Sequence, residues 1–412
     1  MKILFITHYF QPEPNFFFGL PFAKELVRRG HEIQVLTGFP NYPGGKIYDG
    51  YKIKLLQKEI MEGIPVYRFP LYPSHDRSSF KRIMCYSTLS ASMAAIAPWA
   101  IQKADVAYVV QGPATLGLPA TILKWFRSIP FVYNIQDLWP DSLLSTGMFE
   151  GGLKFKVLHG WCNYVYRRAS KITVIAPGMK TRLIERGVPA DKIDVAYNWC
   201  DDSLICRTQP DQNLLKQLGF EGKFNIVFAG NMGKAQALEA VIAAASLTQK
   251  SCPHVQFVFI GSGIEVDNLK QLSQQNNLKN VLFLPRRPVH EIGTILNLAD
   301  VLLVHLRRDP LFAITIPSKT QAYLAMGRPI LMAVEGDAAD LVQKAQAGLT
   351  CLPESPEAIA EAAQKLYTMP RQQREQYGYN GRTYYDNQLA FSHAVSRYEQ
   401  LFQDIASQWK RK

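Results

Sequence analysis

The sequence lacks the patterns that mark membrane-embedded, disulfide-bonded and nucleic-acid-binding proteins. The apolar start at residues 1–6 stops at Thr7 and no small-residue cleavage site follows, so we expect a first strand there and no signal peptide. Six cysteines without a C-x-x-C pair are too sparse for a disulfide framework, so we expect reduced thiols, as in the cytosol. No helix-turn-helix signal, zinc-finger spacing or long Lys/Arg run occurs, so the net charge of +12 favours phosphates or anionic lipid over nucleic acid.

Two enzyme classes also lose support from missing motifs. A dinucleotide site needs G-x-G-x-x-G after a strand, but no glycine precedes Gly19, and the pair Gly261 and Gly263 has no third glycine after it. The eight histidines are scattered, and neither H-E-x-x-H nor Asp-x-Asp occurs. We therefore expect no metal site and no dehydrogenase, and any bound diphosphate must be neutralised by lysine and backbone amides.

The residues that are present predict two α/β domains. With 412 residues, 47% hydrophobic and 19% charged, the chain has the size and composition of a soluble protein of two domains. Short apolar runs alternate with amphipathic stretches, which is typical of βαβ units. Strands are expected at 2–6, 32–36, 66–69, 106–110, 131–135 and 171–174, and then at 225–228, 256–260, 281–284, 301–303 and 330–332. We expect helices at 20–29, closed by a left-handed Gly30, and at 391–409.

Two loops of the second half predict phosphate binding. Ligands of open parallel sheets bind beyond the carboxyl ends of the strands. At 228–234 (FAGNMGK), small residues let backbone amides approach a phosphate, Lys234 adds a charge, and a helix follows from Leu238. At 316–320 (IPSKT), a proline-initiated helix leaves free amides beside Ser318 and Lys319. The alternatives are a tight turn with a solvated lysine and a plainly capped helix.

A polar loop in the first half predicts a site for a polyol. The segment 135–141 (IQDLWPD) places Asp137, Trp139 and Asp141 at the carboxyl end of a strand. Carboxylates accept hydrogen bonds from hydroxyls, and an aromatic face packs on a sugar ring. Gln111, after the strand 106–110, points to the same cleft. A turn with capping aspartates is the alternative.

Several motifs in order resemble glycosyltransferase family 4, and most closely its bacterial colanic-acid and O-antigen transferases. They are 38–43 (GFPNYP), 136–140 (QDLWP), 198–201 (NWCD), 229–233 (AGNMG) and 317–319 (PSK). The resemblance extends to about residue 385. It implies a GT-B fold, in which two Rossmann-like doubly wound parallel-sheet domains face each other across a cleft. The implied domains are 1–205 for the acceptor, 206–385 for the nucleotide-sugar donor, and a helix at 386–412 that crosses back to the N-terminal domain.

The resemblance further implies a metal-independent, retaining transfer from a UDP- or GDP-linked sugar, without a separate cofactor. Gln111 and Asp137 are the implied catalytic residues, and the acceptor is a lipid-linked or oligosaccharide glycan of bacterial surface or exopolysaccharide biosynthesis. The expected location is the cytoplasmic face of the inner membrane. The implied donor contacts are Gly230, Asn231, Gly233, Lys234, Arg287, Ser318, Lys319, Thr320 and Gln321.

The sequence departs from the family at two glutamates that usually contact the donor. Their positions align with Ile314 and Ala322, so the contacts to ribose and sugar must come from elsewhere, for instance Gln321 or Thr320. The glycine-rich loop after the first strand is also replaced, by residues 12–19 (PEPNFFFG). A GT-B sugar-nucleotide epimerase and a non-catalytic glycan- or lipid-binding relative therefore stay open as alternatives.

One segment predicts contact with a membrane surface. Residues 78–100 are mostly apolar and small, but Ser and Thr make them too polar for a spanning helix. The basic residues Arg77, Lys81 and Arg82 and the aromatic Trp99 flank an expected interfacial helix. A buried helix of the N-terminal domain is the alternative.

Overall fold

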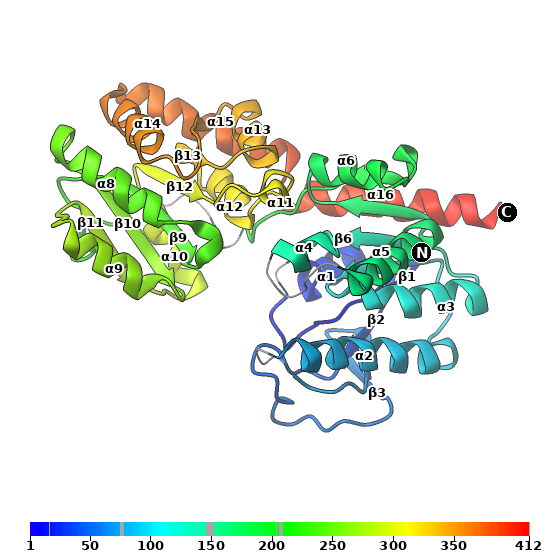
Figure 1. Cartoon of the computed structure of the whole chain (residues 1–412). Coiled ribbons are helices and arrows are strands. Elements are labelled where there is room, and N and C mark those ends of the chain that lie inside the picture. The colour runs from blue at the N-terminus through cyan, green and yellow to red at the C-terminus, as the bar shows by residue number, and fades with distance from the viewer. Residues whose placement is uncertain (16, 75–77, 146–151, 203, 206–208, 412) are drawn as a thin grey trace. The chain divides into compact units, whose positions relative to one another are not determined.

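The computed structural model describes residues 1–15, 17–74, 78–145, 152–202, 204–205 and 209–411 (Figure 1). The chain divides into two compact units, Met1–Tyr197 with Ala394–Lys412, and Asn198–His393. Residues 198–200 belong to the second unit because the Trp199 ring packs on Phe391 at 5.6 Å and the Cys200 amide donates to the Tyr385 hydroxyl at 3.2 Å. Arg77, expected to flank an interfacial helix, lies outside the described residues.

The first unit is built on an eight-stranded sheet in the order β3-β4-β2-β1-β5-β6-β7-β8. Its strands are β1 (Lys2–Ile6), β2 (Glu32–Gly38), β3 (Gln57–Met61), β4 (Ile64–Phe69), β5 (Val106–Gln111), β6 (Phe131–Ile135), β7 (Lys171–Val174) and β8 (Ile193–Val195). All neighbours are parallel except β3 and β4. The order turns back at β1, whose neighbours are β2 and β5, so the carboxyl ends of β1 and β5 form the switch point where ligands bind in such sheets.

The antiparallel β3 is absent from the sequence-based expectation of purely parallel sheets. Glu62 and Gly63 join it to β4 with positive φ angles of 47° and 84°. Two consecutive positive φ angles define the tight hairpin turn that matches the twist of antiparallel strands. The edge strand β3 therefore follows from turn chemistry rather than from an apolar run.

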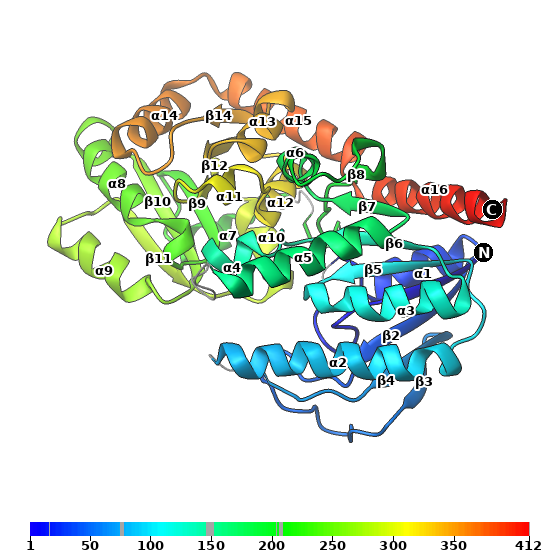
Figure 2. The ribbon, with the colours of Figure 1, turned by 45° about the vertical axis from the view of Figure 1, so that its right-hand side comes forward.

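Helices cover both faces of this sheet. They are α1 (Leu20–Arg28), α2 (Ser79–Ala100), α3 (Gly117–Arg127), α4 (Asp141–Ser145), α5 (Leu153–Arg168), α6 (Pro177–Glu185) and α16 (Phe391–Lys410), with short 3-10 turns at Ala114–Leu116 and Ala190–Lys192. Figure 2 shows α3 beside α2, with α5 on its other side. The helix α1 ends as expected, because Gly30 has a φ of 87° and its amide donates to the Val27 carbonyl at 2.9 Å.

The last helix, α16, completes the core of the first unit. The Tyr398 ring lies 5.4 Å from Phe18, 5.6 Å from Phe22 and 5.2 Å from Tyr108, measured between ring centroids. Its hydroxyl accepts a hydrogen bond from the side chain of Asn134, on β6, at 3.0 Å. Residues from both ends of the chain thus share one hydrophobic core.

The second unit has a six-stranded, wholly parallel sheet in the order β11-β10-β9-β12-β13-β14. The strands are β9 (Phe224–Asn231), β10 (Val255–Ser262), β11 (Val281–Pro285), β12 (Val301–His305), β13 (Ile330–Ala333) and β14 (Gly348–Thr350). The helices are α7 (Gln212–Gln217), α8 (Glu239–Ser251), α9 (Val266–Gln275), α10 (Val289–Leu296), α11 (Pro310–Ala313), α12 (Ser318–Met326), α13 (Asp337–Lys344), α14 (Pro356–Thr368) and α15 (Arg371–Gln388). The order reverses between β9 and β12, as in dinucleotide-binding folds.

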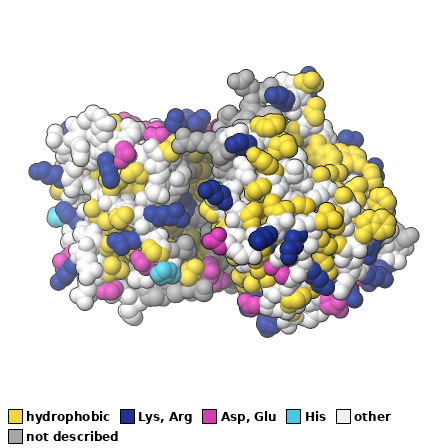
Figure 3. All heavy atoms as spheres, turned by 90° about the horizontal axis from the view of Figure 1, so that it is seen from below, with side chains coloured by type: hydrophobic (Ala, Val, Ile, Leu, Met, Phe, Trp, Pro, Cys, Tyr) yellow, Lys and Arg dark blue, Asp and Glu magenta, His cyan; other side chains and the backbone are white. Residues whose placement is uncertain are grey.

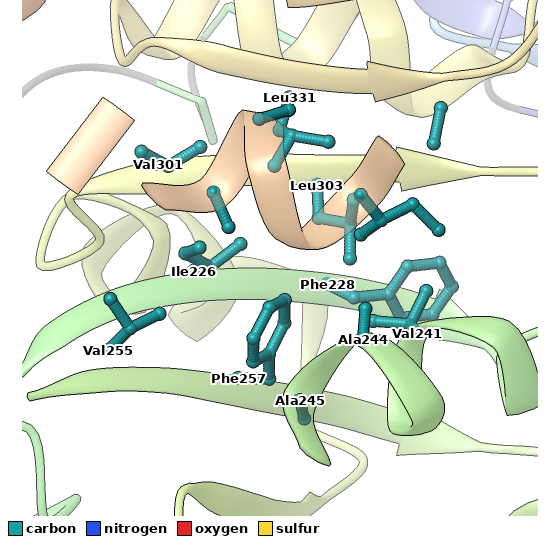
Figure 4. Close-up of a cluster of buried hydrophobic side chains, with 14 of the residues drawn as sticks. Ile226, Phe228, Val241, Ala244, Ala245, Val255, Phe257, Val301, Leu303 and Leu331 are labelled. Atoms are coloured by element: carbon teal, nitrogen blue, oxygen red, sulfur yellow. The ribbon is translucent and has the colours of Figure 1, made fainter. Parts of the chain in front are cut away.

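Its core explains why these strands read as continuous apolar runs. Ile226, Phe228, Phe257 and Leu303 are fully or almost fully buried between the sheet and the helices α8 and α14 (Figure 4). Strands of a parallel sheet are covered on both faces, so most residues along them are apolar. The loops beyond the carboxyl ends of the strands carry the polar residues of the candidate site.

Candidate active site

The carboxyl ends of β9 and β12 form the switch point of the second unit. Gly230 lies near the end of β9 and His305 ends β12. Both strands lead into loops that carry residues expected to bind a donor. The distances around the carboxyl ends of β9 and β12 show which of the residues expected to bind a donor lie close together.

Lys319 brings a positive charge to this switch point. It is the second residue of α12, and its ammonium nitrogen lies 3.6 Å from the centroid of the Phe228 ring. That nitrogen is buried and has no hydrogen-bond partner among the described residues, although the side chain as a whole is partly exposed. A Cβ atom on Gly230 would lie only 3.4 Å from it. Burial lowers the pKa of Lys319 to about 7, so an adjacent anion would be needed to hold it fully charged.

His305 supports the turn that follows β9. Its Nδ1 lies 2.6 Å from the Gln236 carbonyl oxygen, and its Nε2 accepts from the Glu354 amide at 3.1 Å. These two bonds require the neutral ring with the proton on Nδ1. Burial, the largest cause, lowers the pKa of His305 and so favours the same state. The sequence analysis missed this residue, whose only signal is a histidine that ends the buried run 301–305.

The sequence suggested that Lys234 stands at the N-terminus of the following helix, but the structure does not place it there. It begins a short 3-10 turn, Lys234–Gln236, and α8 starts only at Glu239. The turn is closed by the Gly233 amide, which donates to the Gln236 side chain at 3.0 Å, and Asn231 before it is exposed. Lys234 is exposed and lines a polar pocket of about 400 Å³ together with Ala237, Glu239, Glu265, Arg307, Arg308 and Glu354.

The other three residues expected at the start of α12 differ in their exposure. Ser318 is exposed at its first position, whereas Thr320 and Gln321 are buried. The Gln321 amide, in the orientation that satisfies its hydrogen bonds, donates to the Pro317 and Ser318 carbonyls at 3.1 Å. Thr320 keeps a buried hydroxyl without a partner in the described structure. Arg287 is half-buried and follows β11, two strands away from β9.

In the first unit, Gln111 and Asp137 lie together beyond the sheet. Gln111 ends β5 at the switch point, and its side-chain amide donates to the Asp137 backbone carbonyl at 3.1 Å. Both residues line a hollow of about 510 Å³, whose wall also includes His8, Trp139 and Tyr42. The Asp137 side chain is exposed within this hollow, yet desolvation by the surrounding protein raises its pKa. The Gln111 carbonyl oxygen is buried and unpartnered in the described structure.

Asp141 does not join the other two members of its motif. It is absent from the residues that line the hollow, and it pairs with Arg186 and, at 3.5 Å, with Arg182. Arg186 also donates to the Trp139 carbonyl at 3.1 Å. Asp141 therefore fixes the loop that presents Asp137 and Trp139, which is closer to the structural alternative for this residue than to sugar binding.

Glu13 is a buried carboxylate that the sequence analysis did not select. Its Oε1 accepts from the Asn41 and Tyr42 amides, each at 2.8 Å, and its Oε2 is buried with no partner in the described structure. Desolvation raises its pKa to about 7. These two hydrogen bonds connect the loop after β1 to Tyr42, which lines the hollow. Glu13 therefore supports the wall of the hollow without lining it.

The segment expected at a membrane surface forms the long helix α2. One face is buried through Cys85, Leu89, Met93 and Ala97, as the buried-helix alternative requires. On the exposed surface, Trp99, the aromatic residue named in the interfacial expectation, is 84% accessible, and Phe80, a second aromatic residue that the sequence analysis did not select, is 71% accessible. No helix within the described residues is both long and apolar enough to cross a bilayer.

Within the same described ranges, no three His, Cys, Asp or Glu side chains gather as they would around a metal ion. The cations near the candidate donor site are instead side chains, Lys319 and Lys234. The five described cysteines are free thiols.

Comparison with known proteins agrees with this architecture. Residues 20–199 match the glycosyl transferase 4-like domain, and residues 211–384 match the glycosyl transferases group 1 domain. The putative colanic acid biosynthesis glycosyl transferase WcaI of Escherichia coli is 27% identical over 84% of this chain and 86% of its own. The probable glycosyltransferase WbjE of Pseudomonas aeruginosa is 24% identical over 64% of this chain and 66% of its own.

Solved structures show the same fold. Anabaena HepE, crystallised with UDP and glucose, aligns with a TM-score of 0.69 at 19% identity, over 98% of this chain and 99% of its own. WaaG, a glycosyltransferase involved in lipopolysaccharide biosynthesis, aligns with a TM-score of 0.63 at 16% identity and the same two coverages. Two parallel-sheet α/β domains of this kind define the GT-B class. The chain belongs to the glycosyltransferases of this class with a 4-like N-terminal domain and a group 1 C-terminal domain, which confirms the resemblance to family 4.

Proposed function

We propose that this glycosyltransferase transfers a sugar, with retention and without a metal ion, from a UDP- or GDP-linked donor to a lipid-linked glycan in bacterial polysaccharide biosynthesis. The observation that carries the proposal is the buried, unpartnered ammonium of Lys319 at the switch point of the second sheet. A buried cation without a counter-ion is costly to the fold, so its presence there is best accounted for by an anionic ligand.

The donor diphosphate fits this position chemically. The helix α12 starts without a side-chain cap, so its first amides are not taken up by a capping side chain, and Lys319 is the second residue of this helix. Gly230, with a φ of 141°, leaves room beside the ammonium that a side chain would fill. Lys234, which lines the polar pocket beside the turn after β9, supplies a second, exposed charge. The group 1 domain and the UDP complex of a structural relative support a nucleotide-sugar donor.

The acceptor half of the proposal rests on the hollow in the first unit. Asp137, the Gln111 carbonyl and the Trp139 ring offer the acceptors and the aromatic face that a sugar needs. The relative WcaI is named for colanic acid biosynthesis, which supports a polysaccharide pathway for this chain. We assign Asp137 and Gln111 to the reacting end of the acceptor.

The donor can be identified by a thermal-shift screen of nucleotide sugars. A ligand at a hundred times its dissociation constant stabilises the protein by about 2.7 kcal/mol, which is a readily measured shift. Transfer is then assayed with and without an acceptor glycan. An epimerase would convert the donor alone, and a binding relative would shift the melting temperature but form no product.

With the donor in hand, we expect full activity in excess chelator and a product whose anomeric configuration matches that of the donor by NMR. The reason is that lysine and backbone amides, rather than a divalent ion, neutralise the diphosphate in this site. An inverted product, or activity that returns only when a divalent cation is added back, would refute this part of the proposal.

We also propose peripheral association with the cytoplasmic face of the inner membrane through the start of α2. The full chain is expected to sediment with vesicles that contain acidic lipid, and Phe80→Ser with Lys81→Ser should weaken this binding at least about tenfold. Each cation near an anionic surface contributes about 1 kcal/mol, and a buried phenyl ring about 1.5–3 kcal/mol.

A matched control lies on the edge strand β3. Ile60 is 61% exposed and Lys58 is also exposed, so Lys58→Ser with Ile60→Ser removes the same kinds of surface from the same unit. Equal recovery of both double variants and the wild-type chain with acidic and neutral vesicles would show that α2 is an ordinary packing helix.

A further inference from the structure

Two tyrosines lie side by side in the wall of the hollow that holds Asp137. Tyr9 is in the loop after β1 and Tyr42 in the loop after β2, and their ring centroids lie 4.6 Å apart at an angle of 35°. Both side chains are partly exposed, and both line the hollow. Aromatic side chains in the wall of a pocket provide the packing surface for a ligand, while a few polar groups orient it.

Hydrogen bonds to the backbone hold each tyrosine in place. The Tyr9 carbonyl accepts from the Asn15 side-chain amide at 2.9 Å. The Tyr42 carbonyl accepts from the Tyr48 hydroxyl at 2.5 Å, and its amide donates to Glu13 at 2.8 Å. Because Glu13 belongs to the same loop as Tyr9, its carboxylate connects the two loops that carry the aromatic pair.

Glu13 is a costly group for this connection. Its side chain is 1% exposed, and its Oε2 has no hydrogen-bond partner among the described residues. A neutral amide could accept the same two backbone hydrogen bonds through its carbonyl, without the cost of burying a charge. The charge does strengthen those bonds, because hydrogen bonds to an ionised acceptor are about twice as strong as neutral ones. The connection is therefore tightest when Glu13 is ionised.

We propose that Tyr9 and Tyr42 bind the pyranose ring of the acceptor, and that Glu13 is a positioning residue that holds this pair in place. The inference rests on the proposed transferase function and adds to it the residues that recognise the acceptor sugar. In this arrangement the tyrosines pack on the sugar ring, and Asp137, in the same hollow, contacts the reacting hydroxyl.

The groups around Glu13 determine the pH at which the connection changes. Desolvation raises the pKa of Glu13 to about 7, while backbone amides and the charge of Arg68, on β4, oppose the increase. Tyr9, Tyr48 and Cys85, on α2, also lie close enough to interact with the charge of Glu13. Burial raises the pKa of each of these three, so they stay neutral while Glu13 titrates.

The test measures the binding of simple glycosides to the full chain by NMR titration. The probes are the methyl pyranosides of glucose, galactose and N-acetylglucosamine. Tyr42→Leu should weaken the tightest of them at least about tenfold, because the packing surface of one ring is lost. Figure 3 shows hydrophobic side chains over much of the visible surface of the unit that carries α2, so exposure alone does not identify a binding residue. Tyr72→Leu is the matched control, since Tyr72 is 44% exposed but does not line the hollow, and it should leave binding unchanged.

Glu13→Gln tests the positioning role, because it keeps the carbonyl that accepts from the amides and removes the charge. Asp137 titrates in the same hollow in both proteins, so the ratio of the variant and wild-type dissociation constants isolates the effect of Glu13. This ratio should be near one at about pH 6 and rise to roughly fivefold at about pH 8, as expected when a charged hydrogen bond becomes a neutral one. Asp105→Asn is the control. The Asp105 carboxylate also accepts from a backbone amide, that of Lys2 at 2.8 Å, but does not line the hollow, so its loss should not change glycoside binding.

In a transfer assay, the loss in Glu13→Gln should appear in the KM for the acceptor and not in kcat, a division that lower stability alone would not produce. A ratio that does not change with pH, equal losses in Tyr42→Leu and Tyr72→Leu, or no binding of any of the three glycosides would overturn the proposal. These outcomes leave the transferase function intact if nucleotide sugars bind and are transferred. The expected pattern of glycoside binding without any binding of nucleotide sugars would do the reverse.

Discussion

Lys319→Met is expected to stabilise the protein and to weaken donor binding at the same time. The substitution removes a buried ammonium that lies over the Phe228 ring without a hydrogen-bond partner in the described structure. With a pKa of about 7 in place of 10.5, and with allowance for partial exposure, the gain in unfolding free energy at neutral pH is on the order of 2 kcal/mol. Loss of a charged hydrogen bond to the diphosphate should raise the donor dissociation constant roughly tenfold to a hundredfold.

The pH dependence of the stability difference follows from the lowered pKa. Between about pH 7 and 10.5 the unfolded chain binds a proton at Lys319 that the folded chain does not, so the wild type gains stability as the pH rises through this window. The advantage of Lys319→Met is therefore largest at and below about pH 7 and fades toward pH 10.5. Denaturant titrations of both proteins at several pH values measure this.

Donor binding should also take up a proton. The diphosphate favours the charged form of Lys319, so above about pH 7 the wild type should absorb up to one proton for each donor bound, and the methionine variant should not. Calorimetry in buffers of different ionisation enthalpy measures this uptake. Lys234→Ala is the matched control. Because this lysine is exposed, its removal should lower donor affinity about tenfold without a gain in stability. Unchanged donor affinity in both variants would sink the assignment.

Asp137→Asn should lower turnover at least about a hundredfold while donor affinity stays nearly constant. The carboxylate lies beyond β6 in the hollow assigned to the acceptor, and Gln111 holds its backbone. A carboxylate there can orient the acceptor hydroxyl or stabilise positive charge that develops on the sugar ring, and both roles act mainly in the transition state. Desolvation raises the pKa of Asp137, so it takes up a proton at a higher pH than an ordinary aspartate, and activity should fall as the pH drops toward that pKa.

The neighbouring carboxylate provides the comparison. Asp141→Asn breaks the pairing with Arg186 that holds the same loop, so it should cost stability while turnover is largely kept. Steady-state kinetics and thermal melts of the two variants separate the roles. A loss of about 1 kcal/mol of stability with normal turnover in Asp137→Asn would identify Asp137 as a capping residue.

Most of the fold could be predicted because the strands of a parallel sheet are buried on both faces. The bounds expected for β1, β6 and β7 coincide with those in the structure, since each is an apolar run between polar loops. The strands that escaped prediction are the edge strands β3, β8 and β14. Strand β3 (QKEIM) is half polar, and the other two have three residues each, so none carries a periodic signal.

The candidate site was predictable in its residue types but not in its packing. The motif at 316–320 pointed to Lys319, yet nothing in it indicated that the ammonium lies over Phe228 or that Gln321 turns back to its own helix. The sequence allowed two roles for Asp141, sugar binding or a structural role in the turn. Its pairing with Arg186, 45 residues along the chain, favours the structural role. The burial of Glu13 depends likewise on the amides of residues 41 and 42.

The first unit consists of two separate segments of the chain, and this determines which unit can complete its folding first during synthesis. The second unit is continuous, Asn198–His393, whereas the first needs Tyr398 in its core and the pair of Glu399 with Arg29, at 2.9 Å. A ribosome releases the N-terminal sheet long before these residues exist, so Phe22 and Tyr108 must wait for their last packing partner while the second unit is already able to fold. During that interval the nascent first unit exposes an aromatic cluster, and transiently exposed apolar surface of this kind favours aggregation.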